Sequence, residues 1–502
     1  MKFFISLMVS AGLILSPLMA ANAQSATPNL GDDTSMTLGD ERHLGDEIAR
    51  EMYRDPEYVS DPVLDGYLNS IWHPLYEQAK RNGSLSSEMD AQYAWHLFLI
   101  RDKSVNAFAL PGGYFGVHLG LIALTDTPDE FASVLAHETT HVTQRHISRG
   151  MTKESAQMPW LVASMLVGLL AARSNPQIAS AAFATGQAAA IQGQLNFSRD
   201  FEREADRIGF TLMAPAGYDP EGFVAMFDML EHAARLSDNG SYPYLRTHPL
   251  TTERIADMRA RVGEFDRVNK IVPLKADSHT LSLHHLMAAR AAVLADLSVD
   301  AQRFFIKRAE VPSVDNNSIV NLYAAALAAW NMKDRAAAHR FYERLKSGLT
   351  IKDAPNVVQL VHWLGAELQE PVTLNLDSES RVEMLYAVQQ LLASPRVGAS
   401  ELRAVTSRLQ EWLANNKNDV DAWNLLSRVH LMQNQRVRAA IASAESLRAQ
   451  EDDPLALAQY KAAQVIVKEQ GSSADPIDAA IVDSKVRELQ ALERAAAREK
   501  RR

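Results

Sequence analysis

The chain has 502 residues, with 51 Lys and Arg against 61 Asp and Glu and no cysteine. This length exceeds what one ordinary hydrophobic core occupies, so we expect more than one domain. Hydrophobic residues make up 47% and charged residues 22%, a balance that excludes wholesale disorder. The net charge of −10 argues against a polyanion-binding surface, and we expect no nucleic-acid partner.

The first 23 residues have the pattern of a secretory signal peptide. Lys2 precedes an apolar run at residues 3–18 and a small-residue site at residues 21–23. We expect cleavage after Ala23, because the apolar run is short for a membrane span. An uncleaved anchor is the alternative. Export without cysteines implies that packed cores or a bound metal, rather than disulfides, stabilise the protein.

A change of composition near residue 275 divides the remaining chain. Residues 24–275 mix helix-like and strand-like patterns with Gly and Pro between them, whereas residues 276–502 are rich in Ala, Leu, Gln and Arg. We therefore predict a mainly α protein. It has an α+β domain with a small β-sheet at 24–275, followed by an α-helical domain at 276–502.

Several elements are predicted ahead of the chemical motifs. The patterns are typical of helices at 46–53 and 62–82, and of strands at 95–100, 107–110 and 114–124. A Pro-Gly-Gly turn at 111–113 separates the last two strands. We therefore expect these two strands to form a β-hairpin.

The next predicted helix has a strong N-terminal signal. Thr127 is suited to the N-cap, Pro128 to the first helical position, and Glu130 completes a capping box. Gly150 is the expected stop. This helix carries the motif that bears most directly on function.

The motif is His-Glu-Thr-Thr-His at residues 137–141, and it has the spacing of a zinc site. Histidines four residues apart on a helix share one face, so we assign His137 and His141 as ligands of one ion. Glu138 lies one step round the helix and can reach a water on that ion, where a general base acts. Catalytic zinc uses three protein ligands and water. The motif therefore predicts one Zn²⁺ per chain and a third ligand from another segment.

That third ligand is predicted at Glu202, on the next strongly patterned helix. Glu202, Asp206 and Gly209 share one face there, and the glycine would let this helix pack closely against the motif helix. Asp206 is suited to accept the outer N–H of a ligand imidazole. Glu204 points to another face and is the rival ligand.

His146 follows the motif but is not assigned as a ligand. The long zincin pattern continues with a glycine and a correctly spaced histidine, which this chain lacks. On an uninterrupted helix, His146 would lie about 140° round the axis from His141. We expect a surface or packing histidine.

His248, followed by Pro249, and Arg254 form the remaining group of interest. Peptide hydrolysis passes through an oxyanion, and His248 or Arg254 could donate a hydrogen bond to it. His248 could instead occupy the open position on zinc and hold the enzyme latent. The sequence leaves both roles open.

Residues 276–502 contain a weak internal repeat. Two groups of residues fit the small-residue and aromatic positions of tetratricopeptide units: Leu322, Ala325, Ala326, Ala338 and Tyr342, then Trp423, Leu426 and Ala439. An irregular helical bundle is the alternative, because the intervening residues do not keep register. Stacked helix pairs present protein-binding surfaces and rarely carry catalysis.

Residues 158–172 form an uncharged apolar stretch that is too short to span a bilayer. We expect a buried or flap helix. Peripheral membrane contact and a lid over the zinc cleft are the alternatives.

The chemical motifs resemble those of peptidase family M48, a family of zinc metallopeptidases. They are H-E-x-x-H at 137–141, E-x-x-x-D at 202–206, and the later His248-Pro249 with Arg254. The resemblance implies a zincin-like α+β peptidase with Glu202 as a ligand. A signal peptide, a peptidase and tetratricopeptide-like helices, in this order, are similar to periplasmic family members of Gram-negative bacteria. That similarity implies the outer-membrane β-barrel assembly machinery as a partner.

We therefore expect a periplasmic zinc endopeptidase that cleaves misfolded, unfolded or stalled outer-membrane proteins and assists their assembly. An extended substrate could add a strand beside residues 106–110, which would favour unfolded chains. The alternative is a chaperone-like assembly factor. Its helical half would bind clients while its peptidase activity stays latent.

Overall fold

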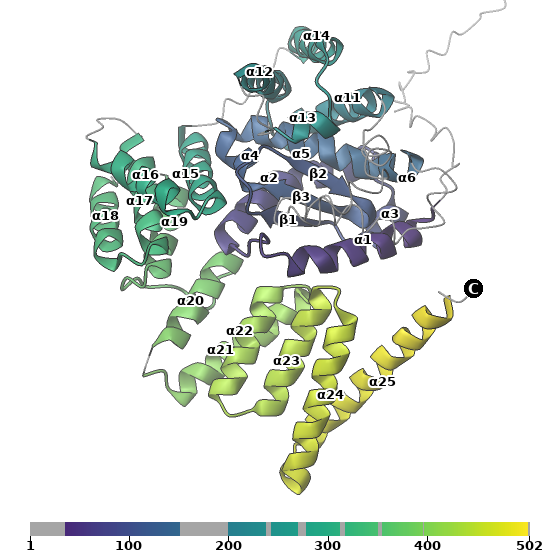
Figure 1. Cartoon of the computed structure of the whole chain (residues 1–502), viewed down its shortest axis with the longest axis vertical. Coiled ribbons are helices and arrows are strands. Elements are labelled where there is room, and N and C mark those ends of the chain that lie inside the picture. The colour runs from purple at the N-terminus through teal and green to yellow at the C-terminus, as the bar shows by residue number, and fades with distance from the viewer. Residues whose placement is uncertain are drawn as a thin grey trace, which may run out of the picture. The chain divides into compact units, whose positions relative to one another are not determined.

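A computed structural model of the protein describes residues 36–150, 199–236, 242–269, 278–311, 317–349, 354–394 and 396–499, and these belong to one compact unit (Figure 1). The predicted signal peptide, the apolar segment 158–172 and the predicted domain boundary at 275 lie outside the described residues. Among the residues described, each helix is too short or too polar to cross a lipid bilayer.

The first half of the chain forms a small sheet surrounded by helices. Up to residue 150 its elements are α1 (Leu38–Arg54), α2 (Pro62–Arg81), α3 (Ser87–Gln92), β1 (His96–Ile100), β2 (Ala107–Leu110), the 3-10 turn η1 (Pro111–Gly113), β3 (Tyr114–His118), α4 (Leu119–Leu124), α5 (Pro128–Thr143) and α6 (His146–Gly150). From residue 199 they are α11 (Arg199–Ala216), α12 (Glu221–Leu236), α13 (Tyr244–Thr247) and α14 (Thr252–Asn269).

The sheet contains the predicted hairpin. Its strand order is β1-β3-β2, with β2 antiparallel and β1 parallel to β3. Gly112, with φ of 74°, makes the turn at η1, where a Cβ would approach Arg42 Cα to 2.8 Å. The predicted strand at 114–124 is wrong after His118, because Leu119–Leu124 is the helix α4. A short buried apolar run does not distinguish strand from helix by periodicity alone.

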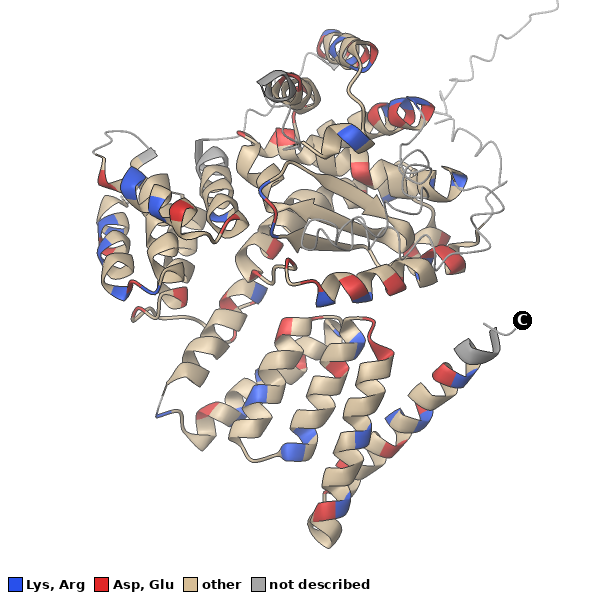
Figure 2. Cartoon of the chain, viewed as in Figure 1, with Lys and Arg blue, Asp and Glu red and all other residues tan. Residues whose placement is uncertain are grey.

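Helix α5 lies at the centre of this half. It packs against β2 on one side and against α2, α11 and α12 on others (Figure 1). The three strands carry no Lys, Arg, Asp or Glu, as Figure 2 shows. Polar groups on α5 therefore sit in an apolar setting, where burying them is costly unless they are paired or bind a metal.

The second half of the described chain is helical throughout. Its helices are α15 (Ser278–Ala295), α16 (Val299–Glu310), α17 (Asn317–Asn331), α18 (Arg335–Gly348), α19 (Pro355–Glu367), α20 (Arg381–Ala393), α21 (Ala399–Asn415), α22 (Val420–Met432), α23 (Arg436–Ala449), α24 (Asp453–Gln470) and α25 (Pro476–Glu499), with the 3-10 turn η2 (Gly471–Ser473). Successive helices pack together, including α17 with α18 and α22 with α23. The small residues Ala325, Ala338 and Ala439 are buried between them. The predicted fold class, mainly α with a small sheet and a helical second half, is confirmed, whereas assignment to tetratricopeptide units stays a prediction.

Buried polar contacts join the two halves. Arg290 on α15 is 1% exposed, and its Nη2 lies 2.7 Å from Asp61 and 2.8 Å from Glu367. His284, on the same helix, lies 2.5 Å from the Tyr67 hydroxyl through Nδ1 and 2.8 Å from the Thr125 carbonyl through Nε2. These contacts place the start of the helical half firmly against α2 and α4.

Candidate metal centre

Helix α5 begins where the sequence predicts and ends earlier. The hydroxyl of Thr127 accepts a hydrogen bond from Glu130 N at 3.2 Å, and Glu130 Oε2 accepts one from Thr127 N at 3.3 Å, which completes the capping box. The helix ends at Thr143 rather than at Gly150, because Arg145 adopts a left-handed φ of 54°. The short helix α6 then begins at the next residue.

Three side chains from α5 and α11 converge, as predicted. His137 Nε2 and His141 Nε2 lie 3.0 Å apart. Glu202 places Oε2 3.4 Å from the first nitrogen and Oε1 3.5 Å from the second. All three residues are 2% exposed or less. The structure therefore brings together the three residues predicted as ligands.

The spacing of these donor atoms suits zinc. Ligands about 2.0–2.2 Å from a tetrahedral zinc are separated by about 3.3–3.6 Å, close to the distances seen here. The charges also suit a divalent cation. With the histidines neutral, the form that binds zinc, buried Glu138, Glu202 and Asp206 against buried Arg254 leave a formal charge of −2, which one Zn²⁺ balances. The residues present thus fit the metal that the motif predicts.

His248 completes the donor cluster. It follows α13, and its Nδ1 lies 3.1 Å from Glu202 Oε1 and 3.3 Å from His137 Nε2. Together with His141, these residues form a group whose donor atoms all lie within 4.8 Å of one another. Tyr244 stacks on His248, with ring centroids 4.6 Å apart, and fixes its orientation. The role of Tyr244 carried no signal in the sequence.

Glu138 lies beside this cluster. Its carboxylate is buried and makes no hydrogen bond to any described residue. A basic group, His248 Nε2, lies 3.5 Å from Glu138 Oε1. One imidazole therefore faces the donor cluster through Nδ1 and the predicted general base through Nε2.

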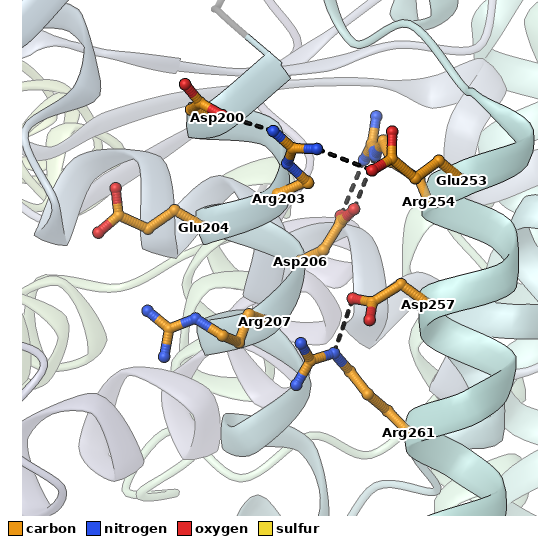
Figure 3. A pocket seen from close by; sticks show the side chains of 9 residues that line it. All are labelled: Asp200, Arg203, Glu204, Asp206, Arg207, Glu253, Arg254, Asp257 and Arg261. Carbon is orange, nitrogen blue, oxygen red and sulfur yellow. Dashed lines mark hydrogen bonds and ion pairs between the residues drawn. The ribbon is translucent and has the colours of Figure 1, made fainter.

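Asp206 and Arg254 support the cluster from behind. Arg254, on α14, donates two hydrogen bonds to Asp206, from Nε at 2.6 Å and from Nη2 at 2.8 Å (Figure 3). Its Nη1 lies 2.9 Å from Glu202 Oε2. Asp206 Oδ1 in turn lies 2.9 Å from His137 Nδ1. The geometry agrees with the predicted support of a ligand imidazole by Asp206. It does not favour Arg254 as an oxyanion donor, because this guanidinium is 4% exposed and bound to carboxylates.

Figure 3 also shows the solvent side of this support. A pocket of about 470 Å³ lies between α11 and α14, and charged side chains of both signs line it. The lining includes exposed ion pairs, such as those of Arg203 with Asp200 and with Glu253. Asp206 forms part of the wall of this pocket, so only its side chain separates the pocket from His137.

Burial and neighbouring charges set the protonation of the cluster. Burial lowers the pKa of His141 well below its usual value, and His137 lowers it further. Burial raises the pKa of Glu202, but His248 and His137 outweigh it and hold that pKa well below its usual range. A neutral imidazole and an ionised carboxylate are the forms that bind zinc. For His137, burial lowers the pKa, but hydrogen bonds with Asp206 and Glu202 raise it to about 9.

The close approach of α11 to α5 depends on one glycine, as predicted. A Cβ on Gly209 would lie 3.2 Å from the carbonyl carbon and oxygen of Ala136 and from His137 N. Such contacts are tighter than van der Waals packing allows without a shift of the backbone. The missing side chain lets α11 bring Glu202 and Asp206 up to the histidines of α5.

His146 is a buried histidine that packs on Phe201 rather than a surface one, and it lies outside the donor cluster. Glu204, the rival ligand, also lies outside that cluster. His146 is completely buried, with Nδ1 3.0 Å from His141 Nδ1 and Nε2 3.1 Å from Glu204 Oε2. The helical rotation that separated His146 from His141 assumed an unbroken helix. Because the chain turns at Arg145, His146 returns beneath His141.

The comparisons with known proteins agree with this geometry. Residues 67–262 match the family model Peptidase family M48. The chain is 26% identical over 481 residues, 91% of each chain, to the beta-barrel assembly-enhancing protease of Escherichia coli K12. A Vibrio cholerae protein provisionally given the same name is 34% identical over 315 residues, so the chain spans 62% of that relative.

A mitochondrial relative extends this group. The mitochondrial metalloendopeptidase OMA1 of Arabidopsis thaliana is 33% identical over 161 residues, 32% of this chain and 30% of its own length. All residues of the donor cluster lie within the segment that matches family M48. The chain therefore carries a peptidase family M48 domain, and it is a zinc metalloendopeptidase homologous to the β-barrel assembly-enhancing proteases.

Proposed function

We propose that His137, His141 and Glu202 hold one Zn²⁺ per chain and that Glu138 is the general base of peptide hydrolysis. The observation that carries this proposal is the convergence of four buried donor residues beside the buried carboxylate of Glu138, which makes no hydrogen bond within the described part of the chain. Bound zinc acidifies water and polarises the peptide carbonyl. Glu138 takes the proton of the attacking water and passes it to the leaving amine. Asp206 and Arg254 orient His137 and Glu202.

Replacing Glu138 by Gln tests the base directly. The amide keeps the size of the side chain but cannot accept the proton, so cleavage of a denatured protein should fall about 10²–10⁴-fold. Zinc content should stay at the wild-type level. Glu253→Gln, an exposed position on α14, is the matched control. Undiminished cleavage by the Glu138→Gln protein would reject the role.

We further propose that His248 closes the site in the resting protein. Its Nδ1 lies 3.1–3.3 Å from the carboxylate of Glu202 and from His137 Nε2, where a fourth ligand would sit. A fourth protein ligand leaves no open position for substrate, as in structural zinc sites. Replacing His248 by Ala should therefore raise basal proteolysis. A fall in proteolysis would instead support the oxyanion role.

We propose outer-membrane proteins, unfolded or stalled during assembly, as substrates, and the β-barrel assembly machinery as partner. The names of the relatives in Escherichia coli and Vibrio cholerae support this assignment. Export to the periplasm, with a signal peptide cut after Ala23, is part of this proposal. An extended substrate would pair with β2, which lies at an edge of the sheet among the described strands. Contact of residues 158–172 with a membrane surface stays a prediction.

A chaperone-like assembly factor is the second candidate. A groove of about 660 Å³ is lined by residues of α21, α22, α23 and α25, which include Leu413, Trp423 and Ile481. Such a groove suits a bound client segment. If a Glu138→Gln strain keeps an intact outer membrane while a strain lacking residues 278–502 does not, binding is the main task. Mass spectrometry of proteins trapped by the Glu138→Gln form identifies the clients.

A further inference from the structure

We propose that His146 and Glu204 form a positioning pair that holds His141 in the tautomer and orientation needed to bind the metal. This inference rests on the proposed function, in which His141 is a zinc ligand through Nε2. It gives a role to His146, which the sequence did not place in the site, and to Glu204, which the sequence offered only as a rival ligand. Neither residue contacts the ion; both act through His141.

The distances define a continuous chain of polar contacts. His141 Nδ1 lies 3.0 Å from His146 Nδ1, and His146 Nε2 lies 3.1 Å from Glu204 Oε2. Glu204 also accepts a hydrogen bond from Arg149 Nη1 at 3.0 Å. His141 and His146 are fully buried, whereas the Glu204 side chain is 26% exposed. The series of polar contacts from His141 through His146 to Glu204 therefore runs from the centre of the site to the surface.

The positions of the hydrogens along this series of contacts follow from metal binding by His141. When His141 Nε2 binds a metal, its Nδ1 carries the hydrogen and donates it to an acceptor. His146 Nδ1 must then offer its lone pair, so the hydrogen of the neutral His146 ring lies on Nε2. Glu204 accepts that hydrogen. Without Glu204, the other tautomer of His146 would oppose two N–H groups and push His141 away.

The backbone is built to place His146 there. Arg145, at φ of 54°, turns the chain back after α5, a conformation that is uncommon for a residue with a side chain. Its guanidinium Nε donates to buried Glu41 at 2.7 Å and its Nη2 donates to the Met36 carbonyl at 2.5 Å. The His146 ring stacks on Phe201, with centroids 4.6 Å apart and planes 10° apart. The backbone turn at Arg145 and the stacking on Phe201 therefore fix the His146 ring independently of any metal.

The two ligand histidines are thus supported in different ways. His137 contacts the carboxylate of Asp206 directly, and Arg254 binds that carboxylate from behind. His141 reaches its carboxylate, Glu204, only through a second imidazole. Outer contacts of this kind change metal affinity by about 10–100-fold when removed. The inference therefore predicts an effect on zinc binding itself, not only on catalysis.

The test compares two substitutions of His146 in the full mature chain. His146→Phe keeps the ring that stacks on Phe201 but removes the acceptor for His141, so zinc affinity should fall about 10–100-fold. His146→Asn places an amide oxygen where Nδ1 lies and should recover most of that loss. Competition with a fluorescent zinc chelator measures both. Equal loss in the two variants, or no loss in His146→Phe, would overturn the positioning role.

Further variants keep the result interpretable. Glu204→Ala changes a partly exposed residue, so it tests the pair even if His146→Phe folds poorly. This variant should bind zinc several-fold more weakly than the wild type. Unchanged zinc affinity would contradict the pairing of His146 with Glu204. Exposed Asp200→Ala, on the same helix, is the control. If His141→Ala retains wild-type zinc affinity, the proposed ligation fails and this inference fails with it. If only His141→Ala loses zinc, the ligation stands and the inference alone is overturned.

Discussion

Asp206 shows how a residue that need not touch the ion can still decide whether the ion is held. Its carboxylate lies between His137 Nδ1, at 2.9 Å, and the guanidinium of Arg254. Burial raises the pKa of Asp206, but Arg254 and His137 outweigh it and hold the pKa below the usual value. The carboxylate therefore stays charged and directs the hydrogen of His137 to Nδ1, leaving Nε2 for the metal.

Substitution of Asp206 by Asn should lower zinc affinity about 10–100-fold. The amide has almost the same volume, but it can present a hydrogen to His137 and leaves Arg254 with one buried carboxylate fewer. Chelator competition at neutral pH measures the change. Asp200→Asn, on the same helix but 82% exposed in its side chain, is the control and should bind zinc normally. Equal zinc affinity in the Asp206 variant would contradict the account.

At the scale of the element, the packing of α11 on α5 decides the geometry of the site. We predict that Gly209→Ala destabilises the protein by about 1–3 kcal/mol and weakens zinc binding, because the new methyl group forces α11 away from Ala136 and His137. Gly263→Ala on α14 is the control, since nothing lies within 4 Å of its Cβ. There alanine should be neutral or stabilising. Chemical denaturation and chelator competition measure both effects; equal behaviour of the two variants would refute the packing argument.

Elements with local signals could be predicted from the sequence. The cap at Thr127 and the Pro-Gly-Gly turn depend on neighbouring residues, and both are as expected. The end of α5 could not be predicted, because the left-handed Arg145 is anchored by Glu41, which lies 104 positions away in the sequence. For the same reason, the position of His146 beneath His141 could not be predicted from the sequence. A rotation calculated on an ideal helix is reliable only as far as the helix continues.

At the scale of the whole molecule, the cluster combines α5, α11 and the residue after α13. Glu202 could be inferred because two histidines leave a zinc site one ligand short. The orientation of His248 could not, because a residue in a connecting segment has no helical face to indicate its direction. Its contact with both Glu202 and Glu138 emerges only from the folded chain.

The contact between the two halves predicts a loss of stability in acid. Burial lowers the pKa of His284 from about 6.5 to about 4, although its bond to the Thr125 carbonyl opposes this. The unfolded chain therefore binds a proton that the folded chain does not, as the pH falls from about 6.5 towards 4. Neutral His284 therefore makes its full contribution to the free energy of unfolding above pH 6.5. That contribution is lost as the pH falls towards 4, and the loss is about 3 kcal/mol at most.

The free energy of unfolding in urea should therefore fall more steeply between pH 7 and 4.5 for the wild type than for His284→Gln. Both proteins are measured with a chelator present, so that zinc release does not contribute. His43→Gln, an exposed position on α1, is the control and should follow the wild type. Parallel curves for the wild type and the His284 variant would show that this contact does not sense pH.

The central claim is that α5 and α11 together hold one zinc ion. The most direct measurement is the metal content of the purified mature protein, compared with Glu202→Ala and with the control Glu253→Ala, with folding checked by circular dichroism. The account predicts one zinc per chain in the wild type and in the control, and loss of zinc from a folded Glu202 variant. A wild type without stoichiometric zinc, or a Glu202 variant that binds it as tightly, would contradict the account.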